Sequence, residues 1–237
     1  MERVKSYSWV LTVIMGIAIT VAVRELATLI AAPPDPNHQP VLASLVRFGI
    51  FFALCIRWTL GTLWYLDKAY ISNKNFGAIT AGYFVDFFVL LTNFLVFVPL
   101  ALTVTAPAIP ASLLAQWLND TLLGGKQVST FIWILVLLLL YDLLWFTAKS
   151  LWWLLIGRIS WFRSWRGDPP RRIHAFWTVL NFLTLLLCAV IFLGYGFLGK
   201  DLQGAEVWIL IVISLASGID IWATIVEDSP YSQWLSP

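Results

Sequence analysis

Six stretches of the chain are long and apolar enough to cross a lipid bilayer as α-helices, and this constrains the fold more than any other feature. A transmembrane helix needs about 20 predominantly apolar residues. The connections between the stretches are short, so the sequence predicts one all-α integral membrane domain over residues 1–237, a polytopic helical bundle. The predicted spans are about 8–31, 41–66, 79–104, 128–155, 173–197 and 205–226.

The composition excludes an ordinary soluble domain. Charged residues make up 12% of the chain and hydrophobic residues 60%, whereas a typical soluble domain has about 25% charged residues. A transmembrane barrel would require alternating apolar and polar residues in strands of about ten residues, and that period is absent from the sequence. The prediction is therefore a membrane protein built of helices.

The basic residues predict the orientation. Cytoplasmic loops of membrane proteins carry an excess of lysine and arginine. On one predicted side lie Arg3, Lys5, Lys68, Lys74, Lys149, Arg158, Arg163, Arg166, Arg171 and Arg172. The other side has Lys126 and Lys200. We expect both termini in the cytoplasm and a prokaryotic inner (plasma) membrane location. The net charge of +2 then reflects topology, and no nucleic-acid partner is expected.

Four charged residues fall inside the apolar spans at nearly the same predicted depth: Arg57, Asp86, Asp142 and Asp220. A charged side chain at the centre of a bilayer costs roughly 2.5–3.5 kcal/mol on insertion scales, so such residues are expected to face the interior of the bundle. Their similar depth predicts one buried polar site in the cytoplasmic half of the membrane.

Helical spacing extends this predicted site. Asn93 follows Asp86 by seven residues, and Lys149 follows Asp142 by the same interval, so each pair shares a helical face. The predicted ion or proton site therefore contains Arg57, Asp86, Asp142, Asp220, Asn93 and Lys149. Further polar stripes are formed by His174, Thr178 and Asn181, and by Ser217, Asp220, Thr224 and Glu227.

Two interpretations of this site remain open. One arginine against three aspartates leaves surplus negative charge unless a carboxyl group is protonated or a cation binds. This surplus favours a site that handles a proton or a cation. Lys149 reduces this surplus of negative charge, because its side chain could reach Asp142. In the second interpretation the buried charges only fix how the helices pack.

A second cluster of charges lies near the opposite surface. Arg24 and Glu25 close the first span, and Arg47 opens the second. Antiparallel neighbouring helices would place these side chains at similar heights. We therefore expect an Arg47–Glu25 ion pair with a structural role.

Two segments are predicted to lie along the membrane surfaces. Residues 109–123 form a short amphipathic pattern, expected at the outer interface. Residues 151–166, the tryptophan–arginine segment, are expected on the inner surface, where they would bind anionic lipid headgroups. The lipid-binding residues would be Trp152, Trp153, Arg158, Trp161, Arg163, Trp165 and Arg166.

The sequence offers little support for catalysis. Tyr141-Asp142 and Gly218-Ile219-Asp220 partly resemble the Tyr-Asp and Gly-x-Gly-Asp motifs of intramembrane aspartyl proteases. Ile219 occupies the position of the second glycine, and the Pro-Ala-Leu element is missing, so no family is assigned. Neither a cofactor motif nor a metal-ligand spacing is present, and no cofactor or metal is expected.

The sequence therefore predicts a small channel or transporter-like protein that passes or senses a cation or proton. The alternative is a non-catalytic subunit or anchor of a larger membrane complex, whose buried charges only specify helix packing. A homo-oligomer is compatible with either function.

Overall fold

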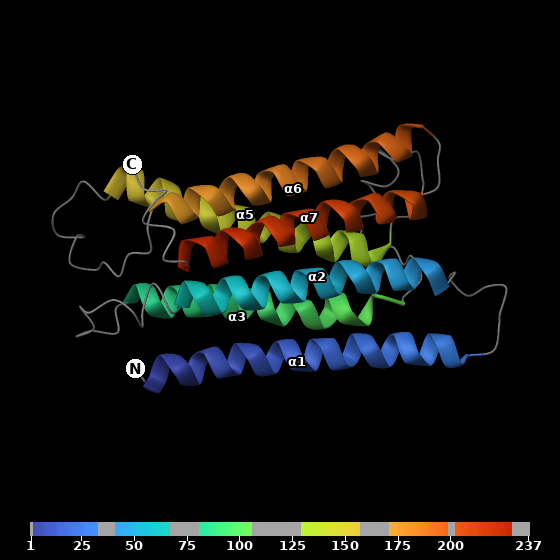
Figure 1. Cartoon of the computed structure of the whole chain (residues 1–237), viewed down its shortest axis with the longest axis horizontal. Helices are drawn as coiled ribbons and strands as arrows, with labels where there is room; N and C mark the ends of the chain where they lie inside the picture. Colours follow the sequence, from blue (N-terminus) through green and yellow to red (C-terminus); the bar gives the residue numbers. More distant parts are fainter. Residues whose placement is uncertain are drawn as a thin grey trace.

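The computed structural model is entirely helical over the residues that it describes, which are 2–32, 41–66, 81–105, 129–156, 171–198 and 202–228. The helices are α1 (Glu2–Ala31), α2 (Val41–Leu66), α3 (Ala81–Leu102), α5 (Thr130–Ile156), α6 (Arg171–Phe197) and α7 (Leu202–Asp228). They run side by side as a bundle (Figure 1). Each is long and apolar enough to cross a membrane, which confirms the prediction of six long apolar helices and fits an integral membrane protein.

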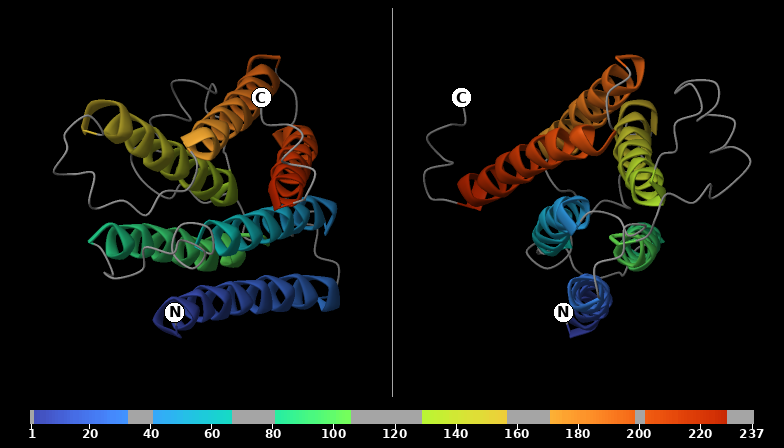
Figure 2. Two further views of the ribbon diagram at one scale, coloured as in Figure 1. Left: turned by 60° about the vertical axis from the view of Figure 1, so that its left-hand side comes forward. Right: turned by 90° about the vertical axis from the view of Figure 1, so that its right-hand side faces the viewer.

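The bundle consists of two groups of three helices (Figure 2). In the first group α1 packs against α2 and α3, and in the second α6 packs against α5 and α7. The groups meet where α2 runs along α7 and where α3 contacts α5. We call the end of the bundle at which α1 begins and α7 ends the terminal end (Figure 1). The second half of α2 and the first half of α3 lie toward this end.

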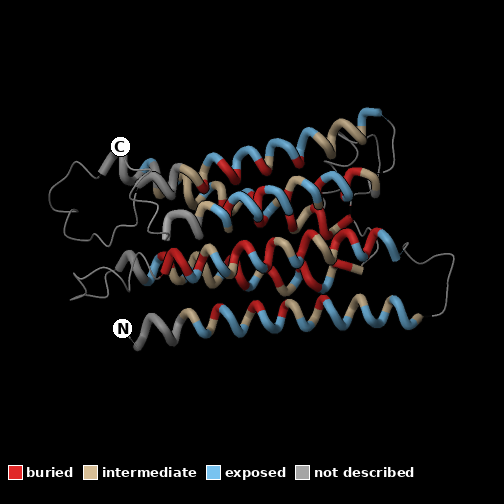
Figure 3. Tube along the Cα trace, viewed as in Figure 1, coloured by how far each residue is buried: buried red, intermediate tan, exposed pale blue. Residues whose placement is uncertain are grey.

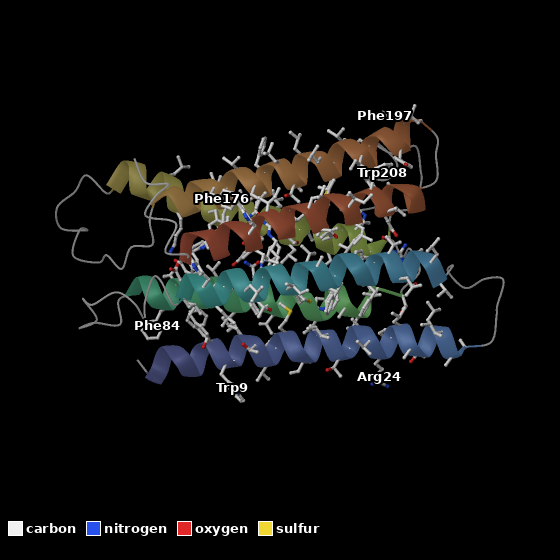
Figure 4. All side chains as sticks on the ribbon, in the orientation of Figure 1. Trp9, Arg24, Phe84, Phe176, Phe197 and Trp208 are labelled. Atoms are coloured by element: carbon white, nitrogen blue, oxygen red, sulfur yellow. The ribbon has the colours of Figure 1, made fainter. Side chains whose placement is uncertain are left out.

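Burial follows the faces along which the helices meet (Figure 3). The apolar core contains Phe51 and Leu54 of α2, Phe97 of α3 and Leu138 of α5, all fully or almost fully buried. Most of the outward-facing side chains are large and apolar, as expected of a surface that faces lipid. Trp9 points away from the bundle on the outer face of α1 (Figure 4).

Two predicted surface segments fall wholly or largely outside the described residues. Residues 109–123 are not described. Of the tryptophan–arginine segment the structure describes only the backbone up to Ile156, where α5 ends. Trp152 and Trp153 therefore lie within α5, while Arg158, Trp161, Arg163, Trp165 and Arg166 lie outside the described residues.

Candidate functional site

Arg57 lies on α2 where this helix faces α7, and its side chain is only 3% exposed. Its Nε donates a hydrogen bond to Oδ2 of Asp220 on α7, at 2.9 Å. Its Nη2 donates to Oδ1 of Asn181 on α6. The third nitrogen, Nη1, is buried and has no hydrogen-bond partner among the described residues. Arg57 thus forms an ion pair with Asp220, one of the three aspartates that the sequence placed at a similar depth.

Asp220 is held from two sides. Its Oδ2 accepts from Arg57, and its Oδ1 accepts from the indole Nε1 of Trp177 at 2.7 Å. The Trp177 ring packs edge-on against Trp64, with centroids 5.9 Å apart. The charge of Asp220 is thus neutralised by a cation, and both of its oxygens have donors.

Asp142 on α5 is also buried, but its partners are uncharged amides. Asn181 Nδ2 donates to Oδ2 of Asp142, and Asn93 Nδ2 lies 3.5 Å from Oδ1. Asn181 therefore bridges Arg57 and Asp142 with its two ends. The amide oxygen of Asn93 is buried and has no partner among the described residues.

A second group of polar residues lies nearer the terminal end. Lys149 on α5 donates to Oδ2 of Asp86 on α3 at 2.6 Å and to the Tyr65 hydroxyl at 2.9 Å. The Tyr65 hydroxyl in turn donates to Asp86. Tyr65 follows Arg57 by eight residues on α2, which separates the two levels by about 12 Å along the helix. Asp86 therefore does not share the level of Arg57, and Lys149 neutralises Asp86 in place of the predicted Asp142.

A cavity of about 50 Å³ lies between these two levels. Its lining includes Arg57, Tyr65, Asp142, Asn181 and Asp220. Aromatic rings of α5, α6 and α2 complete the wall, among them Trp58, Trp145, Phe146 and Trp177. Nitrogen and oxygen atoms lie between the ribbons in both halves of the bundle (Figure 4). The site is thus a small, partly open cavity in which charged and amide side chains meet aromatic rings.

The contacts show which carboxyl group accounts for the surplus negative charge that the sequence predicted. Arg57 pairs with Asp220, and Lys149 pairs with Asp86. Asp142 has only the two amide contacts and no ion pair within the described part of the chain. The extra carboxyl group of the cluster is therefore Asp142.

The predicted Arg47–Glu25 pair is wrong. Arg47 is 3% exposed, and its Nε donates to both carboxylate oxygens of Glu206 on α7, at 3.0 and 2.9 Å. Ser129 Oγ donates to the same carboxylate at 3.1 Å. Arg24 is exposed on the outer face of α1 and points away from the bundle (Figure 4). The helical rotation of α2 turns Arg47 toward α7 and away from α1.

Sequence reasoning missed Glu206, Tyr65 and Trp177. Glu206 could have been found by the same rule as the aspartates, since it is an acidic residue within an apolar span. It was overlooked because it lies at the second position of the predicted span, 205–226, where a charge is usually hydrated. Tyr65 and Trp177 carry no comparable signal, because aromatic residues are frequent at membrane interfaces.

No family model, curated protein or solved structure matches this chain.

Proposed function

We propose that the protein carries or senses protons across a membrane and that Asp142 is the carboxyl group that binds the proton. The observation that carries the proposal is the contrast between Asp142 and the other two aspartates. Asp86 and Asp220 each have a cationic partner, whereas Asp142 has neutral amides. A buried carboxyl group without a cation has less reason to stay ionised, so it is the group best suited to exchange a proton.

The surroundings of Asp142 suit both of its protonation states. The carboxylate accepts from the amide groups of Asn181 and Asn93. When protonated, it needs an acceptor for its own O–H group. The unpartnered Oδ1 of Asn93 would supply one after a rotation of the amide, because asparagine offers a donor and an acceptor at similar positions.

A proton fits this site better than a metal cation. Arg57 lines the same cavity as Asp142 and would repel a metal ion. Within the described ranges, no group of three or more His, Cys, Asp or Glu side chains is placed to hold a metal. A proton needs no such set of ligands, because a single carboxyl group binds it.

The decisive experiment is proton flux in liposomes that contain a pH-sensitive dye. Asp142→Asn preserves the shape of the side chain and removes its proton-binding capacity, so we expect it to abolish flux. Glu25→Gln is the matched control, since it makes the same chemical change on α1, away from the site, and should leave flux unchanged. Parent-level flux in Asp142→Asn, or no flux in the parent protein, would contradict the proposal.

We place the terminal end in the cytoplasm, in a prokaryotic inner (plasma) membrane, on the basis of the basic residues near that end. Single cysteines introduced at residue 2, where α1 begins, and at residue 228, where α7 ends, should react with an impermeant maleimide only after the cells are opened. Labelling of either position in intact cells would show that this end of the chain lies outside the cytoplasm and would contradict the proposed topology.

The alternative is a non-catalytic subunit whose buried charges specify packing. It is favoured by one observation: both Arg57–Asp220 and Arg47–Glu206 join α2 to α7, which fixes the register of the two helices. In that case the partner proteins or anionic lipids would bind elsewhere, with the tryptophan–arginine segment as the predicted surface. The flux experiment separates the two functions, because a packing subunit conducts no protons.

A further inference from the structure

We infer that water in the cavity connects Asp142 to the Tyr65 hydroxyl, and that Tyr65 passes protons between this water and the Asp86–Lys149 pair. This inference rests on the proposed function and specifies the route by which a proton on Asp142 reaches the terminal end. Tyr65 is the only residue that both lines the cavity and, within the described residues, hydrogen-bonds to Asp86 and Lys149.

The cavity has the size and chemistry of a water site. Its volume of about 50 Å³ exceeds the roughly 10–15 Å³ that a cavity needs to hold one water molecule. The Arg57 Nη1 is a buried donor without an acceptor in the described residues, and leaving such a charged donor unsatisfied is costly. The oxygen of one water would accept from Nη1, and a chain of further waters would link Asp142 to the Tyr65 hydroxyl.

The Tyr65 hydroxyl has the donor and acceptor capacity that a relay requires. It donates its proton to Asp86 and accepts from Lys149, so the same oxygen acts as both donor and acceptor. Lys149 is the most exposed member of this group, since 22% of its side chain is accessible. The group therefore extends from the cavity to a partly exposed side chain.

The transfer balances without a charged tyrosine. Protonated Asp142 gives its proton to a cavity water, and a water O–H proton moves to the Tyr65 oxygen. At the same time the original Tyr65 proton moves to Asp86. One O–H bond forms for each that breaks, so the net change is a proton lost by Asp142 and gained by Asp86. Lys149 can then release a proton to bulk water and recover one from Asp86.

The first test is Tyr65→Phe, which removes the hydroxyl and retains the ring. We expect proton flux to fall by about tenfold or more, in line with the loss of a positioned proton-transfer group. Tyr141→Phe is the matched control, because Tyr141 precedes Asp142 on α5 but is not among the residues that line the cavity. Its flux should stay at the parent level. Equal flux in Tyr65→Phe and the parent protein would overturn the relay.

The second test leaves Tyr65 and its hydrogen bonds intact. Gly61 lines the cavity, and a Cβ atom added there meets no other atom within 4 Å. Gly61→Leu should therefore displace cavity water and slow flux by about tenfold, because the water link to Tyr65 is lost. Gly16→Leu is the control: Gly16 has equal space on the exposed face of α1 and lies outside the cavity lining.

Infrared spectroscopy provides a readout that is independent of net transport. Hydrogen–deuterium exchange of the protonated Asp142 carboxyl, assigned by its loss in Asp142→Asn, should slow in Tyr65→Phe and Gly61→Leu but not in their controls. If Asp142→Asn abolishes flux while both cavity variants behave like the parent, the proposed function stands and the relay is wrong. If Asp142→Asn has no effect on flux, the proposed function itself is wrong.

Discussion

The Arg47–Glu206 pair and the Arg57–Asp220 pair join the same two helices, yet their surroundings differ. The Glu206 carboxylate accepts hydrogen bonds from the Arg47 guanidinium and from the Ser129 hydroxyl. Neither Arg47 nor Glu206 lines the cavity. Arg57–Asp220 borders the cavity beside a second carboxyl group, and the Arg57 Nη1 has no hydrogen-bond partner among the described residues. The first arrangement has balanced charge, which suits a fixed contact between helices. The second has surplus carboxylate and space for water, which suits a change of protonation.

The largest expected effect tests the balanced pair. Arg47→Met leaves the Glu206 carboxylate buried without its cation, so the free energy of unfolding should fall by about 3–5 kcal/mol. Chemical unfolding in detergent, followed by circular dichroism, measures the loss. Arg47→Met combined with Glu206→Leu should recover most of it, because the buried charge is gone. A double variant as unstable as the sum of its single variants would show that the pair contributes no coupling.

Arg57→Met should have a smaller effect, about 1–3 kcal/mol, because Asp220 retains the Trp177 bond and cavity water can solvate its freed oxygen. The same unfolding assay applies. Asp220→Asn in the Arg57→Met background should restore part of the loss. An Arg57→Met variant that is less stable than Arg47→Met would reverse the comparison of the two pairs.

Ser129→Ala should cost about 1 kcal/mol. Ser129 Oγ donates to Glu206, and it also accepts from the backbone N–H of Ile132 at the start of α5, in the manner of an N-cap. The variant loses the cap and one hydrogen bond, while the Arg47–Glu206 pair remains. Its proton flux should equal that of the parent. A change in flux would mean that this end of the bundle also takes part in transport.

The smallest expected loss of stability is that of Asp142→Asn, within about 1 kcal/mol, because its present partners are neutral amides that can hydrogen-bond to another amide. This variant should unfold like the parent although it abolishes flux. Glu206→Gln makes the equivalent change in the balanced pair and should be clearly less stable than Asp142→Asn. Similar losses for the two variants would remove the distinction between a proton-binding and a structural carboxyl group.

The spans were predictable because hydropathy is a local property. The predicted boundaries 41–66 coincide with those of α2, and the others differ from the helix ends by a few residues. The gathering of Arg57, Asp142 and Asp220 around one cavity also followed from depth along the spans. Depth alone could not pair Asp86 with Lys149 or Arg47 with Glu206, since partners depend on how each helix is rotated and which helices are neighbours.

The amino-acid sequence alone determined that the chain forms six apolar helices and that their buried charges include more carboxylates than cations. The helices follow from hydropathy, since every backbone polar group in a bilayer must be satisfied within its own helix. The excess of carboxylates follows from counting the charged residues along the spans. Only the tertiary structure decided which carboxyl group is left without a cation. The packing of α2 along α7 and of α3 against α5 assigned Arg57 to Asp220 and Lys149 to Asp86, and thereby left Asp142 among amides beside the cavity.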